Sequence, residues 1–140
     1  MTGAVFPTAR LLLATAITAL VLLAVATMLK GGAEWSVKFY QSVVLGLAAA
    51  TIAHVFGIFA GAFLASMPQR SGGAMTAYLG STVVRFLGTP VLALSLYFAL
   101  PTEPKPLLIG AAAGYLLILV VDIATMLRSL SGSAGSRVTP

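Results

Sequence analysis

Four long apolar runs, separated by short polar segments, make up most of this 140-residue chain. A helix needs about 20 apolar residues to cross the hydrocarbon core of a bilayer, because each residue adds about 1.5 Å of length. The runs are continuous rather than alternating, which favours helices over the strands of a membrane barrel. We therefore predict an all-α integral membrane protein with four transmembrane helices in two antiparallel hairpins. The predicted spans cover residues 11–29, 39–67, 75–100 and 107–127.

The composition agrees with this fold class and limits the number of domains. Hydrophobic residues make up 59% of the chain and charged residues 8%, whereas a soluble domain carries about 25% charged residues. Four spans use nearly all of residues 1–128, so we predict a single four-helix transmembrane domain there. Residues 129–140 are rich in Ser and Gly, and we predict that they form a flexible C-terminal tail.

The supply of reactive side chains is small. The chain has no cysteine, one histidine and three acids, Glu34, Glu103 and Asp122. Disulfides, thiolate catalysis and cysteine-based metal sites are therefore excluded, and one histidine cannot form a two-histidine metal or haem site within a protomer. The motifs of P-loop proteins, serine hydrolases and zinc proteases do not occur. We expect a protein that is not an enzyme and that binds no metal or cofactor.

The formal net charge is +5, and the basic residues stand singly near the ends of the apolar runs. In a membrane protein this pattern is a topology signal and a means of contacting anionic lipid headgroups, so we expect the lipid bilayer and not nucleic acid as a partner. The excess of basic residues favours a cytoplasmic location for both termini. The side of the termini holds Arg10, Arg70, Arg128 and Arg137, and the other side holds Lys30, Lys38 and Lys105.

Two opposite charges lie inside the apolar runs, Arg85 in the third and Asp122 in the fourth. Each charge at membrane depth costs roughly 2.5–3.5 kcal/mol on insertion scales, so such residues pair or face a wet interior. In a hairpin centred between Glu103 and Pro104, the two residues stand at equal distances from the centre. We therefore predict an ion pair, which is interpreted either as a lock between the two spans or as part of an ion path or partner-docking site.

His54 lies in the middle of the second predicted span. In a hairpin of the second and third spans centred near Ser71, it stands opposite Gly88, one helical turn from Arg85. His54, Arg85 and Asp122 are therefore predicted to form one intramembrane polar cluster. In that cluster the imidazole serves either as a hydrogen-bonding group between helices or as a proton relay.

Small residues mark the faces on which helices in a bilayer approach closely. The second and fourth spans each contain a G-x-x-x-G motif, and further small residues extend the stripe of the second span. Such a stripe serves either packing within one chain or contact with another subunit, and both interpretations stay open at this point. The predicted helix-packing or partner face consists of Gly46, Gly57, Gly61, Gly110 and Gly114.

Four further features suggest a family. A short basic N-terminus precedes the first span, and Trp35 precedes a Gly/Ala-rich stretch at residues 43–50. The third span contains Ser81-Thr82-Val83-Val84-Arg85, and the fourth opens with Pro106 before apolar residues. In these features residues 10–127 resemble the ATP synthase protein I family, which are small four-span bacterial membrane proteins typically encoded beside the subunits of F-type ATP synthase.

The chain departs from the pattern of that family at two places. Family members often carry Gly-Glu-x-x-Lys in the third span, where this chain has Ser81, Thr82 and Arg85. They also often carry Pro-Asn in the second span, where residues 53–54 are Ala-His. We infer that Asp122 takes over the acidic role that Thr82 cannot perform.

The resemblance implies a non-enzymatic membrane assembly factor or accessory subunit of F-type ATP synthase, which helps to build the c-subunit rotor ring. It implies the bacterial inner membrane as the location and the membrane-sector subunits, especially c subunits, as partners. Transport of Mg²⁺ or Ca²⁺ has also been proposed for the family, but such a path needs several oxygen ligands, and this chain has one intramembrane acid. The alternatives are a small homo-oligomeric cation or proton transporter or channel and an accessory subunit of another complex.

Overall fold

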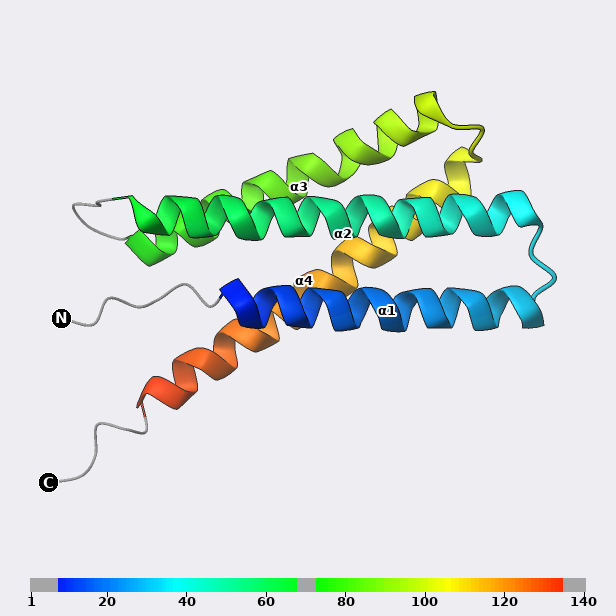
Figure 1. Cartoon of the computed structure of the whole chain (residues 1–140). Helices are drawn as coiled ribbons and strands as arrows, with labels where there is room; N and C mark the ends of the chain where they lie inside the picture. Colours follow the sequence, from blue (N-terminus) through cyan, green and yellow to red (C-terminus); the bar gives the residue numbers. More distant parts are fainter. Residues whose placement is uncertain (1–7, 68–72, 135–140) are drawn as a thin grey trace, which may run out of the picture.

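The computed structural model describes residues 8–67 and 73–134, and in these ranges the chain folds into four helices. They are α1 (Thr8–Gly32), α2 (Val37–Ser66), α3 (Gly73–Ala99) and α4 (Pro104–Ala134). Each is long and apolar enough to cross a bilayer, so the chain is a multi-pass membrane protein. The predicted fold class, four transmembrane helices in two antiparallel hairpins, is confirmed (Figure 1).

Each predicted span lies inside its helix or extends at most one residue past the end of it. The flexible tail was predicted to begin at residue 129, whereas α4 continues to Ala134. Residues 129–134 of the predicted tail are therefore helical. Extending an existing helix by one residue is much easier than starting a helix, so the Ser and Gly residues of this segment do not end α4. The rest of the predicted tail, residues 135–140, lies outside the described residues.

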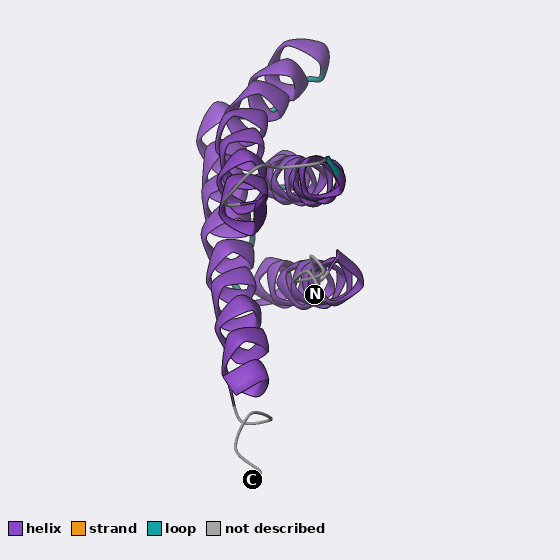
Figure 2. Ribbon diagram, turned by 90° about the vertical axis from the view of Figure 1, so that its left-hand side faces the viewer, coloured by secondary structure: helices purple, strands orange, loops and turns teal. Residues whose placement is uncertain are grey.

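The helices form two layers (Figure 2). Helices α1 and α2 make up one layer, and α3 and α4 make up the other. Helix α2 packs extensively on both α3 and α4, whereas α3 and α4, although neighbours in the chain, share the smallest contact of the helix pairs that touch. The reason is visible in Figure 1, where α3 and α4 diverge from their shared turn. Helix α2 is therefore the central element of the bundle.

Alanine and glycine residues allow the helices around α2 to approach closely. Ala49, Ala93 and Ala111 form a buried cluster where α2, α3 and α4 meet, with Leu92 and Leu96 packed against it. In lipid there is no hydrophobic drive to bring helices together, so close packing of small side chains supplies much of the attraction. The core is accordingly built mainly from small residues.

Helices α2 and α4 run in the same direction and cross with their backbones in contact. A β-carbon placed on Gly46 would collide with the backbone of α4 at Leu107, and one placed on Gly110 would collide with the backbone of α2 at Val43. One turn farther along α4, Gly114 lies against the same face of α2. Glycine is needed at Gly46 and Gly110 because helix backbone leaves no room there for a side chain.

Aromatic and basic residues gather where α1 turns into α2. The rings of Trp35 and Phe39 pack with their centroids 4.8 Å apart. The Lys30 ammonium lies 4.7 Å from the centroid of the Tyr40 ring, and the Tyr40 hydroxyl is hydrogen-bonded to Thr27 at 3.0 Å. Trp and Tyr favour the headgroup level of a bilayer, so this end of the bundle marks one membrane surface.

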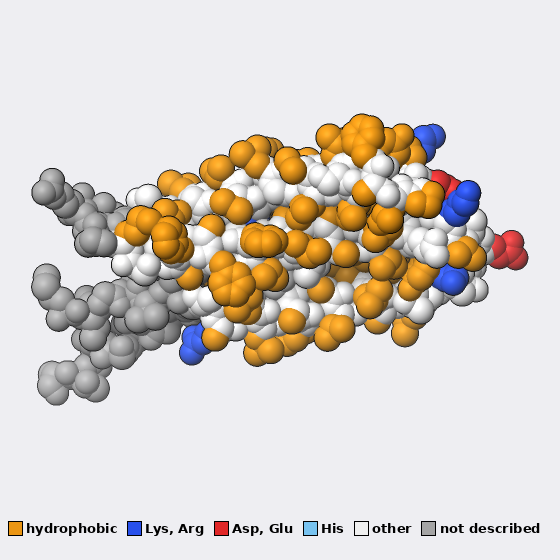
Figure 3. Space-filling view, turned by 45° about the horizontal axis from the view of Figure 1, so that its top comes forward, with side chains coloured by type: hydrophobic (Ala, Val, Ile, Leu, Met, Phe, Trp, Pro, Cys, Tyr) orange, Lys and Arg blue, Asp and Glu red, His pale blue; other side chains and the backbone are white. Residues whose placement is uncertain are grey.

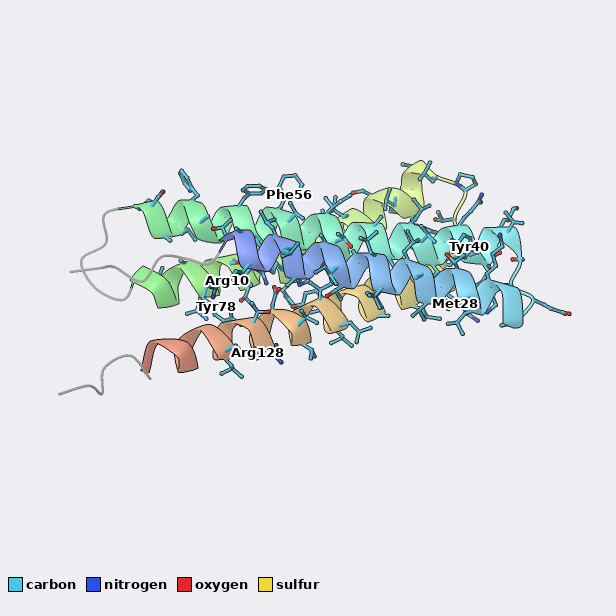
Figure 4. All side chains as sticks on the ribbon, turned by 60° about the horizontal axis from the view of Figure 1, so that its bottom comes forward. Arg10, Met28, Tyr40, Phe56, Tyr78 and Arg128 are labelled. Atoms are coloured by element: carbon cyan, nitrogen blue, oxygen red, sulfur yellow. The ribbon has the colours of Figure 1, made fainter. Side chains whose placement is uncertain are left out.

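The outer surface of the bundle is apolar over its middle, with charged groups at the ends (Figure 3). Phe56, for example, is 62% exposed and points away from the other helices (Figure 4). Arg10 and Arg128 lie at one end of the bundle, and Tyr40 lies at the other (Figure 4). This distribution fits four helices surrounded by acyl chains. The two remaining residues of the predicted basic side, Arg70 and Arg137, lie outside the described residues.

Candidate intramembrane site

The predicted ion pair between the third and fourth spans is present. Nη1 of Arg85 on α3 donates to Oδ2 of Asp122 on α4, and the exposed fractions of the two side chains are 3% and 1%. Opposite charges that bond each other out of contact with lipid avoid much of the cost of two separate charges at membrane depth. The pair joins two helices that otherwise contact each other little.

Helix α2 provides the space through which Arg85 reaches Asp122. A β-carbon placed on Gly57 would collide with Cγ of Arg85, and it would stand 2.8 Å from Nε of Arg85 and 2.9 Å from the carbonyl oxygen of Ser81. The arginine side chain therefore crosses the face of α2 at a residue that has no side chain. Arg85 lies 14 residues before the end of α3 at Ala99, and Asp122 lies 18 residues after the start of α4 at Pro104. The levels of the two charges therefore match to within about one helical turn. Gly57 leaves the gap that the guanidinium needs.

His54 lies one helical turn before Gly57 and is completely buried. Its Nδ1 is 3.1 Å from the carbonyl oxygen of Ala50, and its ring packs on Tyr115 of α4 with the centroids 5.5 Å apart. The Arg85 side chain crosses α2 at Gly57, three residues from His54. The described residues therefore place His54 beside the ion pair, although no hydrogen bond joins it directly to Arg85 or Asp122.

Several polar atoms in this interior have no hydrogen-bond partner among the described residues. They belong to five side chains that are each at most 2% exposed, namely Thr15 Oγ1, His54 Nε2, Ser81 Oγ, Arg85 Nε and Asp122 Oδ1. A buried polar group without a partner costs roughly 1–3 kcal/mol, and buried water commonly satisfies such groups in proteins. Chemically, these unpartnered donors and acceptors can bind water.

Three residues of this site, Thr15, Ser81 and Tyr115, were not predicted from the sequence. Ser81 stands four residues before Arg85, and this helical spacing places both on one face of α3. For Thr15 no such signal exists, because hydroxyl residues recur along the helices. Most of them donate to the carbonyl four residues earlier, as Thr89 does to Arg85. Only the packing of α1 shows that Thr15 faces inward.

The five predicted glycines are all buried, but they do not form a single face. Gly46, Gly110 and Gly114 lie at the crossing of α2 and α4, whereas Gly57 makes room for Arg85. Gly61 lies one turn beyond Gly57 on the same stripe of α2. These contacts support packing within the chain, because buried glycines cannot meet another subunit unless the helices separate.

Comparisons with known proteins add no assignment to this geometry. The chain matches no family model, no curated protein and no solved structure. Within residues 8–67 and 73–134, no group of three His, Cys, Asp or Glu side chains is placed to hold a metal ion. The functional assignment must therefore come from the site itself and from the resemblance of residues 10–127.

Proposed function

We propose that the chain is a non-enzymatic assembly factor or accessory subunit of F-type ATP synthase, which helps to build the c-subunit ring in the bacterial inner membrane, with both termini in the cytoplasm. The observation that carries this proposal is the bond between Asp122 and Arg85 in the interior. A carboxylate used in this way locks helices together and leaves a stable bundle with an apolar exterior. The identity of the partner comes from the family resemblance of residues 10–127.

The partner surface is assigned to the helices that are least covered by the rest of the chain. In the most apolar segments of α1 and α3, 17% of the residues are buried, against 44% in α2. The glycine stripes of α2 and α4 are already used inside the bundle. Helices of c subunits would therefore pack on the lipid-facing sides of α1 and α3 rather than on the G-x-x-x-G motifs.

Recovery of c subunits with the tagged chain is the first expected result of this proposal. The chain would be extracted in mild detergent from the host that encodes it, and its partners identified by mass spectrometry. A tagged four-span membrane protein of unrelated function serves as the control. In a strain that lacks the chain, we expect less assembled c-ring and more monomeric c subunit, and the wild-type chain should restore the ring. Unchanged ring assembly together with no recovered c subunit would contradict the proposal.

A second candidate function, proton transport, is favoured by the unpartnered polar atoms. Nε2 of His54 and Oδ1 of Asp122 lie at membrane depth with no partner among the described residues. Such groups can relay protons through intervening water in transporters.

Liposome flux measurements separate the two candidates. If the chain is a scaffold, liposomes containing the purified wild type should acidify no faster than protein-free liposomes when a pH gradient and a potential are imposed. The control is the Asp122→Asn variant, which keeps the size of the side chain and removes its charge. Flux in the wild type that Asp122→Asn abolishes would instead establish the transporter function.

A further inference from the structure

An apolar groove runs between α3 and α4 on the lipid-facing side of the bundle. It consists of two adjoining hollows with volumes of about 240 and 400 Å³ that share the lining residues Pro90, Ala93 and Leu108. The hollow of about 240 Å³ ends at Phe86 and Tyr115, and the hollow of about 400 Å³ reaches Pro104 at the turn. The groove exists because α3 and α4 diverge from that turn while their side chains remain too small to fill the angle.

The walls of the groove favour hydrocarbon over water. Thr89 is one of the few polar residues in the lining, and its hydroxyl donates to the carbonyl oxygen of Arg85 at 2.9 Å, so it is already satisfied. Phe86, Leu94 and Leu108 are 58–63% exposed along the open side. A space of this size exceeds the roughly 30 Å³ share of one water molecule, and apolar cavities stay dry. An occupant of the groove must therefore be apolar.

The length of the groove selects an acyl chain over a transmembrane helix of a partner. From Phe86 to Tyr97, α3 rises about 16 Å at about 1.5 Å per residue. The hydrocarbon core of a bilayer is about 30 Å thick, so one leaflet contributes about 15 Å. The groove thus runs from mid-membrane to the headgroup level of one leaflet. A partner helix would need a contact twice as long.

The positively charged side chain of Lys105 lies next to Pro104, where the groove ends. Lys105 is exposed and lies three residues before Leu108, so both residues belong to one face of α4. The ammonium is attached where a headgroup would meet the first turn of α4, whose dipole is positive at this end. The backbone N–H of Glu103, the acid two residues before Lys105, donates to Ser42 on α2 at 2.9 Å, and no ion pair joins Glu103 to Lys105 among the described residues.

We propose that the α3–α4 groove is a binding site for one anionic phospholipid, with an acyl chain along the groove and the phosphate on Lys105. The groove does not use the ion-pair residues, and the experiment below contains no c subunit, so its outcome does not depend on the proposed role in ATP synthase assembly. The floor of the groove is nevertheless close to the polar interior. Tyr115 contacts Phe86 in the groove at 6.3 Å and His54 in the interior at 5.5 Å, measured between ring centroids.

Native mass spectrometry of the purified full chain tests this site without any partner protein. The chain would be released from nanodiscs containing equal amounts of phosphatidylglycerol and phosphatidylcholine. We expect the wild type to retain one lipid, with phosphatidylglycerol in excess. Ala112→Phe, which fills the groove from an exposed position in its wall, should lose this lipid. Ala16→Phe, at an exposed alanine of α1, is the matched control and should retain it.

The charge of Lys105 is tested separately by variants of residues that lie outside the hydrocarbon, which are expected to fold normally. Lys105→Gln should keep a lipid but lower the ratio of phosphatidylglycerol to phosphatidylcholine about fivefold, the equivalent of about 1 kcal/mol for one basic residue at the membrane surface. Lys38→Gln changes an exposed lysine at the same end of the bundle and should leave the ratio unchanged. The proposal is overturned if the wild type retains no lipid or retains both lipids equally. It is also overturned if Ala112→Phe keeps the lipid or if Lys38→Gln acts as strongly as Lys105→Gln.

Discussion

Asp122→Ala is expected to destabilise the protein more than the double change of Asp122→Ala with Arg85→Leu. The single variant leaves a guanidinium buried without its counter-ion, and breaking a buried pair in this way costs about 3–5 kcal/mol. The double variant removes both charges and replaces the arginine with a side chain that suits an apolar interior. Removing the second charge should therefore restore much of the stability that removal of the first one lost.

The measurement is thermal unfolding in detergent, followed by circular dichroism, together with the amount of protein recovered from membranes. Arg128→Leu is the control, because Arg128 is exposed at the end of the bundle and its loss should have little effect. Equal unfolding temperatures for the single and double variants would show that Arg85 and Asp122 do not neutralise each other in the folded chain. That outcome would remove the main support for a scaffold with a closed interior.

Gly46→Ala and Gly110→Ala are expected to have the second large effect, because each adds one methyl group where two backbones touch. The new β-carbon of Gly46→Ala would stand 2.6 Å from the backbone nitrogen of Ala111. Overpacking of a core commonly costs about 1–3 kcal/mol. We expect losses at the upper end of this range or beyond it, because the obstacle is helix backbone, which cannot rotate away as a side chain can.

Gly31→Ala provides a matched control for these two variants. Gly31 also lies in a helix, but a β-carbon there would meet nothing within 4 Å. Its replacement should be neutral or slightly stabilising, since alanine favours a helix over glycine by up to about 1 kcal/mol. Unfolding of the three variants at the same temperature would mean that α2 and α4 do not cross at Gly46 and Gly110.

The position of the ion pair shows which parts of the site can be predicted from the sequence. Arg85 and Asp122 could be matched because residues at equal distances from a turn meet in an antiparallel hairpin. The match needs only the residue numbers and the loop predicted at 101–106. The same reasoning places His54 within one turn of Arg85. In the structure the match succeeds only because Gly57 leaves room for the arginine. That need could not be read from a G-x-x-x-G motif, which is common in apolar helices.

The number of spans, their approximate limits and the level of the buried charges follow from the sequence itself. They depend on local properties, namely the length of each apolar run and the cost of placing a charge in hydrocarbon. The pairing of helices was decided only by the tertiary structure, including the central place of α2, the parallel contact of α2 with α4 and the groove between α3 and α4. Lipid tails are as apolar as leucine, so hydrophobicity cannot show which face of a membrane helix turns inward, and the fit between particular small and large side chains makes that choice.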